Sequence, residues 1–158
     1  MLCNIMASIL IMQPIYTPSI SPCSPYFVAQ IDSIEDLKYD DVNQTKLSDN
    51  LDRLDRFANF QYNWNGYGAE PIPNQLIVRT KNLLQNLKEQ PDVFPTANKS
   101  IQIEYEKTNG EYLEFEIFGD NHVHMFRVYA DGTECDETFN FDLSQINKNV
   151  GEFYGRID

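Results

Sequence analysis

The chain has 158 residues, a formal net charge of -12 and an apolar fraction of 42%. This length and composition predict one globular domain around a single hydrophobic core. The acidic excess argues against direct binding to nucleic-acid phosphates or to an anionic membrane surface. No run of about 18 apolar residues is present, so a membrane-spanning helix is not expected.

The first 31 residues differ from the rest, since they carry no charged side chain and hold four of the eight prolines. Proline at this density disfavours a long helix. We therefore interpret residues 1–31 as an uncharged Pro-rich arm ahead of a single α+β domain at residues 32–158. A secretory signal is the alternative, but no Lys or Arg precedes the apolar run and no A-x-A site follows it.

Three cysteines without C-x-x-C spacing favour free thiols and a cytoplasmic location.

Three helices are expected. Leucines at helical spacing predict the first helix from Ser48 to Asn59, with Ser48 as its N-cap. A second amphipathic helix is predicted from Gln75 to Lys88, capped by Asn74 and ended ahead of a proline. The C-terminal stretch from residue 143 fits a last helix, which Gly151 and Gly155 would weaken.

Four strands are expected between the second and third helices. Alternating apolar and acidic residues predict strands at 101–106 and 113–117, joined by an Asn-Gly hairpin turn. Glycine-containing turns then lead into strands at 122–130 and 134–141. The expected fold class is α+β: a four-stranded antiparallel meander with two N-terminal helices and one C-terminal helix packed on one face.

The most specific string in the chain is Asn63-Trp64-Asn65-Gly66-Tyr67-Gly68-Ala69, followed by Pro71-Ile72. Together with Ile101-Gln102-Ile103-Glu104-Tyr105, it resembles short bacterial proteins without an assigned function. Those proteins carry Asn-Trp-Asp-Gly-x-Gly-Ala, a Pro-Ile pair and a strand written Ile-x-Leu-Glu-Trp. The resemblance covers about Leu47 to Ile117, with Asn65 in place of Asp and Tyr105 in place of Trp. It implies a soluble bacterial α+β domain and no particular reaction.

Trp64 and Tyr67 offer large amphipathic surfaces, and the two glycines beside them permit close approach of the backbone. This loop is therefore a candidate site for a ligand or a partner. The alternative is that Trp64 fills the core between the first helix and the sheet while the glycines shape the turn. We favour the packing interpretation, because aromatic-plus-glycine loops commonly serve as packing devices.

His122 and His124 are two residues apart, so on a strand both would point to one face and could bind one metal ion. Glu114 or Glu116 could complete such a site. No Cys or third His lies near them in sequence, and we favour an exposed strand face.

A nucleophile pair of Cys135 with either histidine has no local support. No phosphate-loop, serine-hydrolase or zinc-protease motif occurs, and we expect no cofactor.

Residues 101–142 hold eleven acids against two bases, a net charge of -9. Four of these acids, Glu104, Glu106, Glu114 and Glu116, would share the solvent-exposed face of the sheet. Such a face can supply acid/base chemistry if one carboxyl is desolvated, attract a basic partner, or only keep the protein soluble.

A solvated face of the last kind is the commonest case, and between the other two uses we prefer recognition. We predict a non-enzymatic binding protein, inhibitor- or immunity-like, that engages a basic protein partner through the acidic sheet face. The alternative is a small ligand-binding domain or enzyme that uses the Trp64–Tyr67 loop and nearby His and Glu residues. The sequence leaves the oligomeric state open.

Overall fold

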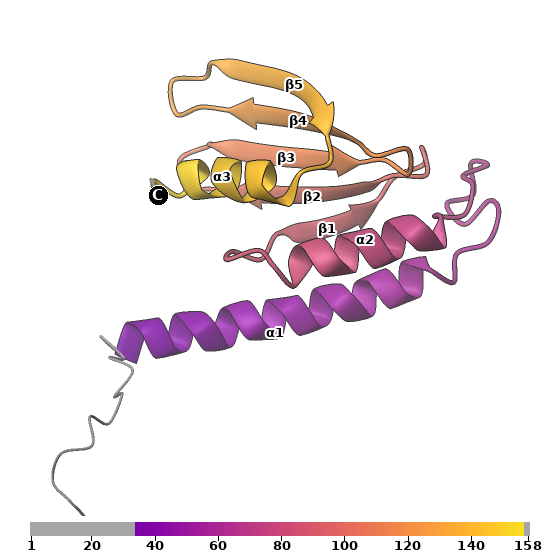
Figure 1. The fold of residues 1–158 in the computed structure, drawn as a ribbon, viewed down its shortest axis with the longest axis horizontal. Helices are drawn as coiled ribbons and strands as arrows, with labels where there is room; N and C mark the ends of the chain where they lie inside the picture. Colours follow the sequence, from indigo (N-terminus) through magenta and orange to yellow (C-terminus); the bar gives the residue numbers. More distant parts are fainter. Residues whose placement is uncertain (1–33, 157–158) are drawn as a thin grey trace, which may run out of the picture. The chain divides into compact units, whose positions relative to one another are not determined.

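The computed structural model describes residues 34–156, which fall within the unit Asp32–Asp158. The predicted Pro-rich arm at residues 1–31 lies outside the described residues. The described chain is α+β, with three helices and a five-stranded antiparallel sheet (Figure 1). In chain order the elements are α1 Ile34–Phe57, α2 Asn74–Leu84, β1 Asp92–Pro95, β2 Ile101–Glu106, β3 Tyr112–Ile117, β4 His122–Val128, β5 Glu134–Asn140 and α3 Leu143–Phe153.

The strands lie in the sheet in the order in which they occur in the chain, and each pair is antiparallel. The α+β class and the meander topology are confirmed, but the count of four strands is wrong. The missed strand, β1, has only four residues and ends at Pro95. A proline is tolerated there because β1 is an edge strand, where one side of the backbone needs no ladder partner.

The first helix is much longer than predicted, and Ser48 lies inside it rather than at its N-cap. The apolar stripe marks only the half of α1 that contributes Leu54 and Phe57 to the core. The preceding turns make polar contacts instead. The Asn43 side chain donates to the Lys88 carbonyl (2.8 Å) and accepts from the Gln90 amide (2.9 Å). Hydrophobic periodicity cannot detect a segment held in this way.

The second helix ends at Leu84, four residues before its predicted end, and its N-cap is Pro73 rather than Asn74. The Gln90 side chain, which is buried, donates from Nε2 to the carbonyl of Leu84 at 2.7 Å. One of the carbonyls that every helix leaves unpaired at its C-terminus thereby gains a side-chain partner. Leu87 is still buried, so the apolar pattern continues beyond the helix.

The third helix has well-formed ends. Asp142 is its N-cap, and Oδ1 accepts hydrogen bonds from the amides of Ser144 (2.8 Å) and Gln145 (3.2 Å). At the other end Gly155 has a φ of +74°, and the Arg156 amide donates to the Gly151 carbonyl at 2.8 Å. This is the Schellman arrangement, in which a left-handed glycine closes the helix. Gly155 therefore terminates α3 rather than weakening it.

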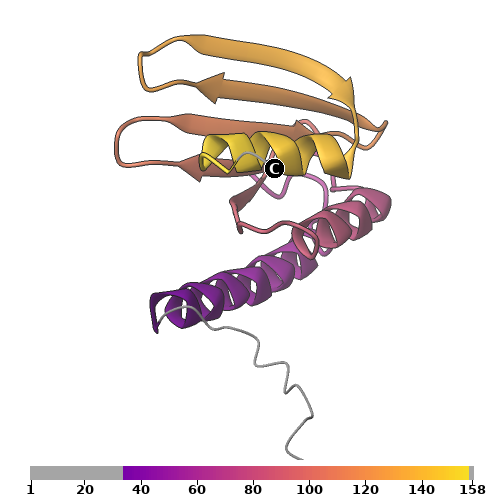
Figure 2. The ribbon, with the colours of Figure 1, turned by 60° about the vertical axis from the view of Figure 1, so that its left-hand side comes forward.

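One hydrophobic core joins the helices to the sheet. It contains side chains from all three helices and the alternate residues of β1 to β4 that point toward them, including Val93, Ile103, Phe115 and Met125. Helix α3 lies across β2 and β3 (Figures 1 and 2), where the Phe153 and Tyr105 rings are 6.3 Å apart. Helix α1 packs against α2 and β1. None of the described helices is long and apolar enough to cross a membrane.

Candidate functional site

The strand residues that point away from the core form a second surface, which we call the open face. All of its members are exposed or half-buried. Because side chains alternate along each strand, the register assigns its members. They are Asp92, Phe94, Gln102, Glu104, Glu106, Tyr112, Glu114, Glu116, His122, His124, Phe126, Val128, Glu134, Asp136, Thr138 and Asn140.

The centre of the open face is a pair of carboxylates. Glu104 of β2 and Glu114 of β3 are direct cross-strand partners, an arrangement of like charges that destabilises a sheet. The Gln102 amide donates to Glu104 (2.5 Å), and the Tyr112 hydroxyl donates to Glu114 (2.6 Å). Burial raises the pKa of Glu104, hydrogen bonding from Tyr112 opposes the rise, and the nearby Glu114 charge adds to it.

The other two predicted glutamates flank this pair. Glu116 is held by hydroxyl groups, since its Oε1 accepts from Ser100 Oγ at 2.5 Å and from Thr96 Oγ1 at 3.4 Å. Glu106 is exposed at the end of β2, opposite Tyr112. The four predicted glutamates therefore lie on one surface, and each presents its carboxylate in a different polar environment.

The open face of the described strands contains no Lys or Arg. The two bases between residues 101 and 142, Lys107 and Arg127, lie over the Phe153 ring on the helix side, at 4.5 Å and 5.8 Å from its centroid. Aromatic side chains lie among the acids instead: the Tyr112 and Phe126 rings are 6.4 Å apart. The surface thus combines negative charge with apolar area, and aromatic residues are enriched at protein interfaces.

The two histidines share the open face, as predicted for residues at i and i+2, but each has its own carboxylate partner. His122 Nδ1 lies 3.1 Å from Asp120, and His124 Nε2 lies 2.8 Å from Asp136. Within residues 34–156 no group of three or more His, Cys, Asp or Glu side chains is placed to hold a metal ion. The contact with His122 also lowers the pKa of Asp120.

The register separates Cys135 from the histidines. Cys135 is opposite Arg127 on the helix side of the sheet, whereas His124 and its partner Thr138 point to the open face. The nearest polar contact of the Cys135 thiol is Glu137, at 3.8 Å. A Cys–His nucleophile pair is therefore excluded in this register, because the two side-chain types lie on opposite faces.

The predicted loop site is organised by its own hydrogen bonds. Asn65 Oδ1 accepts from the amides of Tyr67 (2.9 Å) and Ala69 (3.1 Å), and Asn63 Oδ1 accepts from the amide of Gly68 (2.7 Å). Gly66 and Gly68 have φ angles of +78° and +84°, which favour glycine. Both asparagines thus act on the loop backbone.

Trp64 does not fill the core between α1 and the sheet. It is half-buried, it stacks on Phe60 at 4.7 Å between ring centroids, and its Nε1 donates to the Glu70 carbonyl at 3.0 Å. Phe60 in turn packs against the core. Tyr67 is 93% exposed. Among the described residues no hydrogen bond, ion pair or ring contact joins this loop to the four glutamates.

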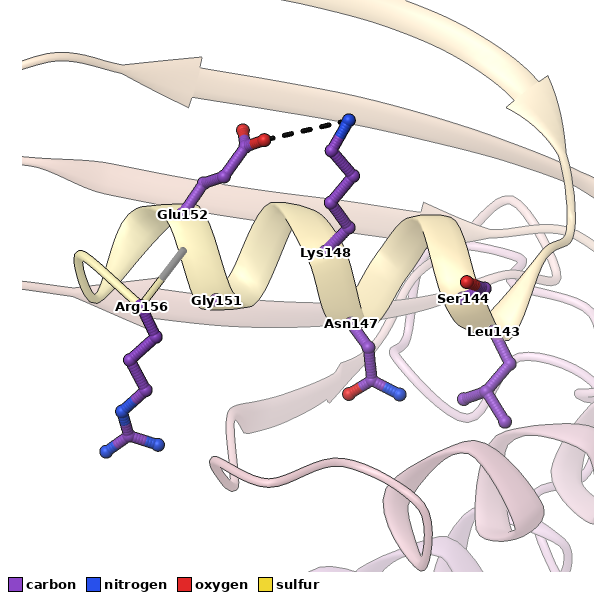
Figure 3. A pocket seen from close by; sticks show the side chains of 7 residues that line it. All are labelled: Leu143, Ser144, Asn147, Lys148, Gly151, Glu152 and Arg156. Atoms are coloured by element: carbon purple, nitrogen blue, oxygen red, sulfur yellow. Dashed lines mark ion pairs between the residues drawn. The ribbon is translucent and has the colours of Figure 1, made fainter. Parts of the chain in front are cut away.

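Sequence reasoning did not single out the pocket along the outer side of α3 (Figure 3). Its cations already have partners: Lys148 pairs with Glu152 at 3.8 Å, and Arg156 pairs with the buried Glu89. Burial raises the pKa of Glu89, while Arg156 opposes the rise. The charged side chains that line the pocket are therefore neutralised by one another. The only sequence signal for this pocket was the polar side of the third helix, where Ser144 and Lys148 are exposed.

Comparison of the chain with protein-family models, with curated proteins and with solved structures finds no match. The geometry of the open face is therefore the basis on which a function can be proposed.

Proposed function

We propose that this protein is a non-enzymatic binding protein, inhibitor- or immunity-like, that engages a basic protein partner through the open face. One observation carries the proposal: Glu104, Glu114 and Glu116 project side by side from the central strands, on a face where none of the described strands places a Lys or Arg. A surface of one charge sign attracts a partner of opposite sign and accelerates their association. Tyr112 and Phe126 add the aromatic area that such an interface buries.

The carboxylates support recognition better than catalysis. General acid/base chemistry needs a group positioned against a bound substrate. The acids of the open face instead extend from Asp92 on β1 to Asp136 on β5. This arrangement supports a broad contact with another protein surface.

The test is capture of the partner by the full-length protein, followed by binding measurements with two charge-reversed variants. E114K/E116K reverses two charges on the open face. D49K/D52K reverses two exposed charges on α1 and serves as the matched control. We expect the open-face variant to slow association by about tenfold or more at low salt, whereas the control changes it little.

Circular dichroism and urea unfolding of both variants establish that each is folded. E114Q/E116Q provides a gentler change, because an amide oxygen still accepts the hydrogen bonds from Tyr112 and Ser100. Equal slowing by the open-face and α1 variants would contradict the proposal, since it would reflect net charge alone. Binding that is insensitive to salt would also contradict it.

A further inference from the structure

The outer edge of β5 is a seven-residue strand with a neighbour on one side only. In the sheet order β5 is last, and it pairs with β4 over its whole length, from Glu134 to Asn140. Five of its seven residues are exposed, and the strand contains neither proline nor glycine. Such an edge is a template onto which another extended chain can add.

The hydrogen bonds at the two ends of the β4–β5 ladder identify the backbone groups that face outward. The Tyr129 amide donates to the Thr133 carbonyl, and the Phe141 amide donates to the Asn121 carbonyl. Bonded and non-bonded pairs alternate in an antiparallel ladder. Residues 135, 137 and 139 therefore bond to β4. The N–H and C=O groups of Glu134, Asp136, Thr138 and Asn140 point away from it, and no described residue pairs with them.

The opposite edge of the sheet shows what a covered edge looks like in this fold. Helix α1 packs on β1 and supplies side-chain donors to one carbonyl of this strand and to one carbonyl just before it. Asn50 donates to the carbonyl of Pro91 (2.9 Å), and Arg53 donates to the carbonyl of Val93 (3.2 Å). No described helix does this for β5. The two edges differ in kind, and β5 is the one able to accept a strand.

The charge of β5 determines which kind of strand can pair with its outer edge. Strand β5 carries Glu134, Asp136 and Glu137 and no base. Pairing with β5 of a second copy would set three carboxylates of each chain along one seam, which disfavours self-association. The side chain of Asp136 lies in one cross-strand row with Phe126, Glu114 and Glu104. A strand added beside β5 would place one of its own side chains next in this row, opposite Asp136, and a Lys or Arg at that position would face a carboxylate.

We infer that the basic partner adds an extended segment to the outer edge of β5, with Lys or Arg at alternate positions facing the open face. The inference rests on the proposed function and adds its mode of binding. Backbone hydrogen bonds to residues 134, 136, 138 and 140 supply the pairing. The acids of the open face supply the preference for a basic sequence.

The probe is an acetylated, amidated eight-residue peptide of alternating Lys and Val, added to the full-length protein. A matched peptide with all backbone nitrogens methylated keeps the charge but cannot pair as a strand. We expect the first peptide to slow hydrogen exchange at the amides of Glu134, Asp136, Thr138 and Asn140 by about tenfold or more. The methylated peptide leaves this exchange unchanged.

Thr138→Pro removes an outward-facing amide without changing charge and without removing a bond to β4. Thr138→Val keeps the amide and is its matched control. We expect the proline variant to weaken peptide binding by about tenfold or more and the valine variant to bind as wild type does. Unfolding curves show whether both variants are folded, and the exchange measurement on wild type requires no variant.

Three results would overturn the inference. The four amides could already be protected in the free protein, Thr138→Pro could bind the peptide as tightly as wild type, or the peptide could fail to protect the edge. Peptide binding that depends on Glu114 and Glu116 but leaves the edge amides exchanging would exclude strand addition while still supporting the proposed function. Failure of the proposed function itself would appear in the partner capture, where E114K/E116K would bind normally.

Discussion

The two faces of the sheet are made by the same strands but have opposite character. Phe115 and Glu114 are neighbours on β3; Phe115 is completely buried against the helices, and Glu114 points to the open face beside another carboxylate. The helix side therefore stabilises the fold, whereas the open face concentrates like charges that oppose it. Like charges gathered outside the core fit a surface kept for function rather than for stability.

A pair of phenylalanine substitutions tests this comparison with the largest expected effect. Phe115→Ala creates a cavity in the core and should lower the free energy of unfolding by about 3–5 kcal/mol. Phe126→Ala, on the neighbouring strand but on the open face, should lower it by about 1 kcal/mol, because the ring is half-buried against Tyr112. Urea unfolding measures both. Similar losses for the two variants would show that the open face is part of the core.

The Asn63–Ala69 loop belongs with the stabilising part of the molecule, and Asn65 tests this assignment with an intermediate effect. Asn65→Ala removes the acceptor for two loop amides and should lower the free energy of unfolding by about 1–2 kcal/mol. Asn65→Asp keeps an acceptor at that position and should change it by less than about 0.5 kcal/mol. A large loss with Asp would mean that the amide nitrogen, rather than the oxygen, holds the loop.

The smallest expected effect is the change in stability with pH that comes from Glu104 on the open face. Because burial raises the pKa of Glu104 above its ordinary value of 4.5, the folded state binds this proton more tightly than the unfolded state. The contribution of Glu104 to stability is therefore favourable below pH 4.5 and is lost as the pH rises through the raised value. Glu104→Gln should lack this part of the pH dependence. Urea midpoints of both proteins between pH 4 and pH 7 measure it, and parallel curves would argue against a raised pKa.

The sequence predicts the α+β class, the strand meander and α3 because these depend on local hydrophobic patterns and turns, whereas the two helix caps predicted from sequence, Ser48 and Asn74, are wrong. Glycine-containing turns locate β2 to β5 to within a residue or two, and acids at alternate positions mark β2 and β3. The first half of α1 and the whole of β1 could not be found in this way. They are held by contacts distant in sequence, such as Asn43 with Lys88 and Asn50 with Pro91, which leave no periodic signal.

The sequence was enough to predict which face of the sheet holds the candidate site, but not how its residues pair with one another. Alternation is enough to put Glu104, Glu106, Glu114 and Glu116 on one side of a sheet. The pairing of Glu104 with Glu114, and the separation of Cys135 from the histidines, depend on strand register, which the turns only suggest. The role of Trp64 depends on its stacking on Phe60 and could not be read from the motif.

An NMR footprint of the captured partner tests most directly whether the open face is the surface that meets it. We expect the largest chemical-shift changes on the open face and on its β5 edge, and we expect added salt to reduce them as the complex dissociates. The open-face residues are Glu104, Tyr112, Glu114, Glu116 and Phe126, and the edge residues are Glu134, Asp136, Thr138 and Asn140. Changes confined to the Trp64–Tyr67 loop or to the outer side of α3, with the open face unaffected, would contradict it.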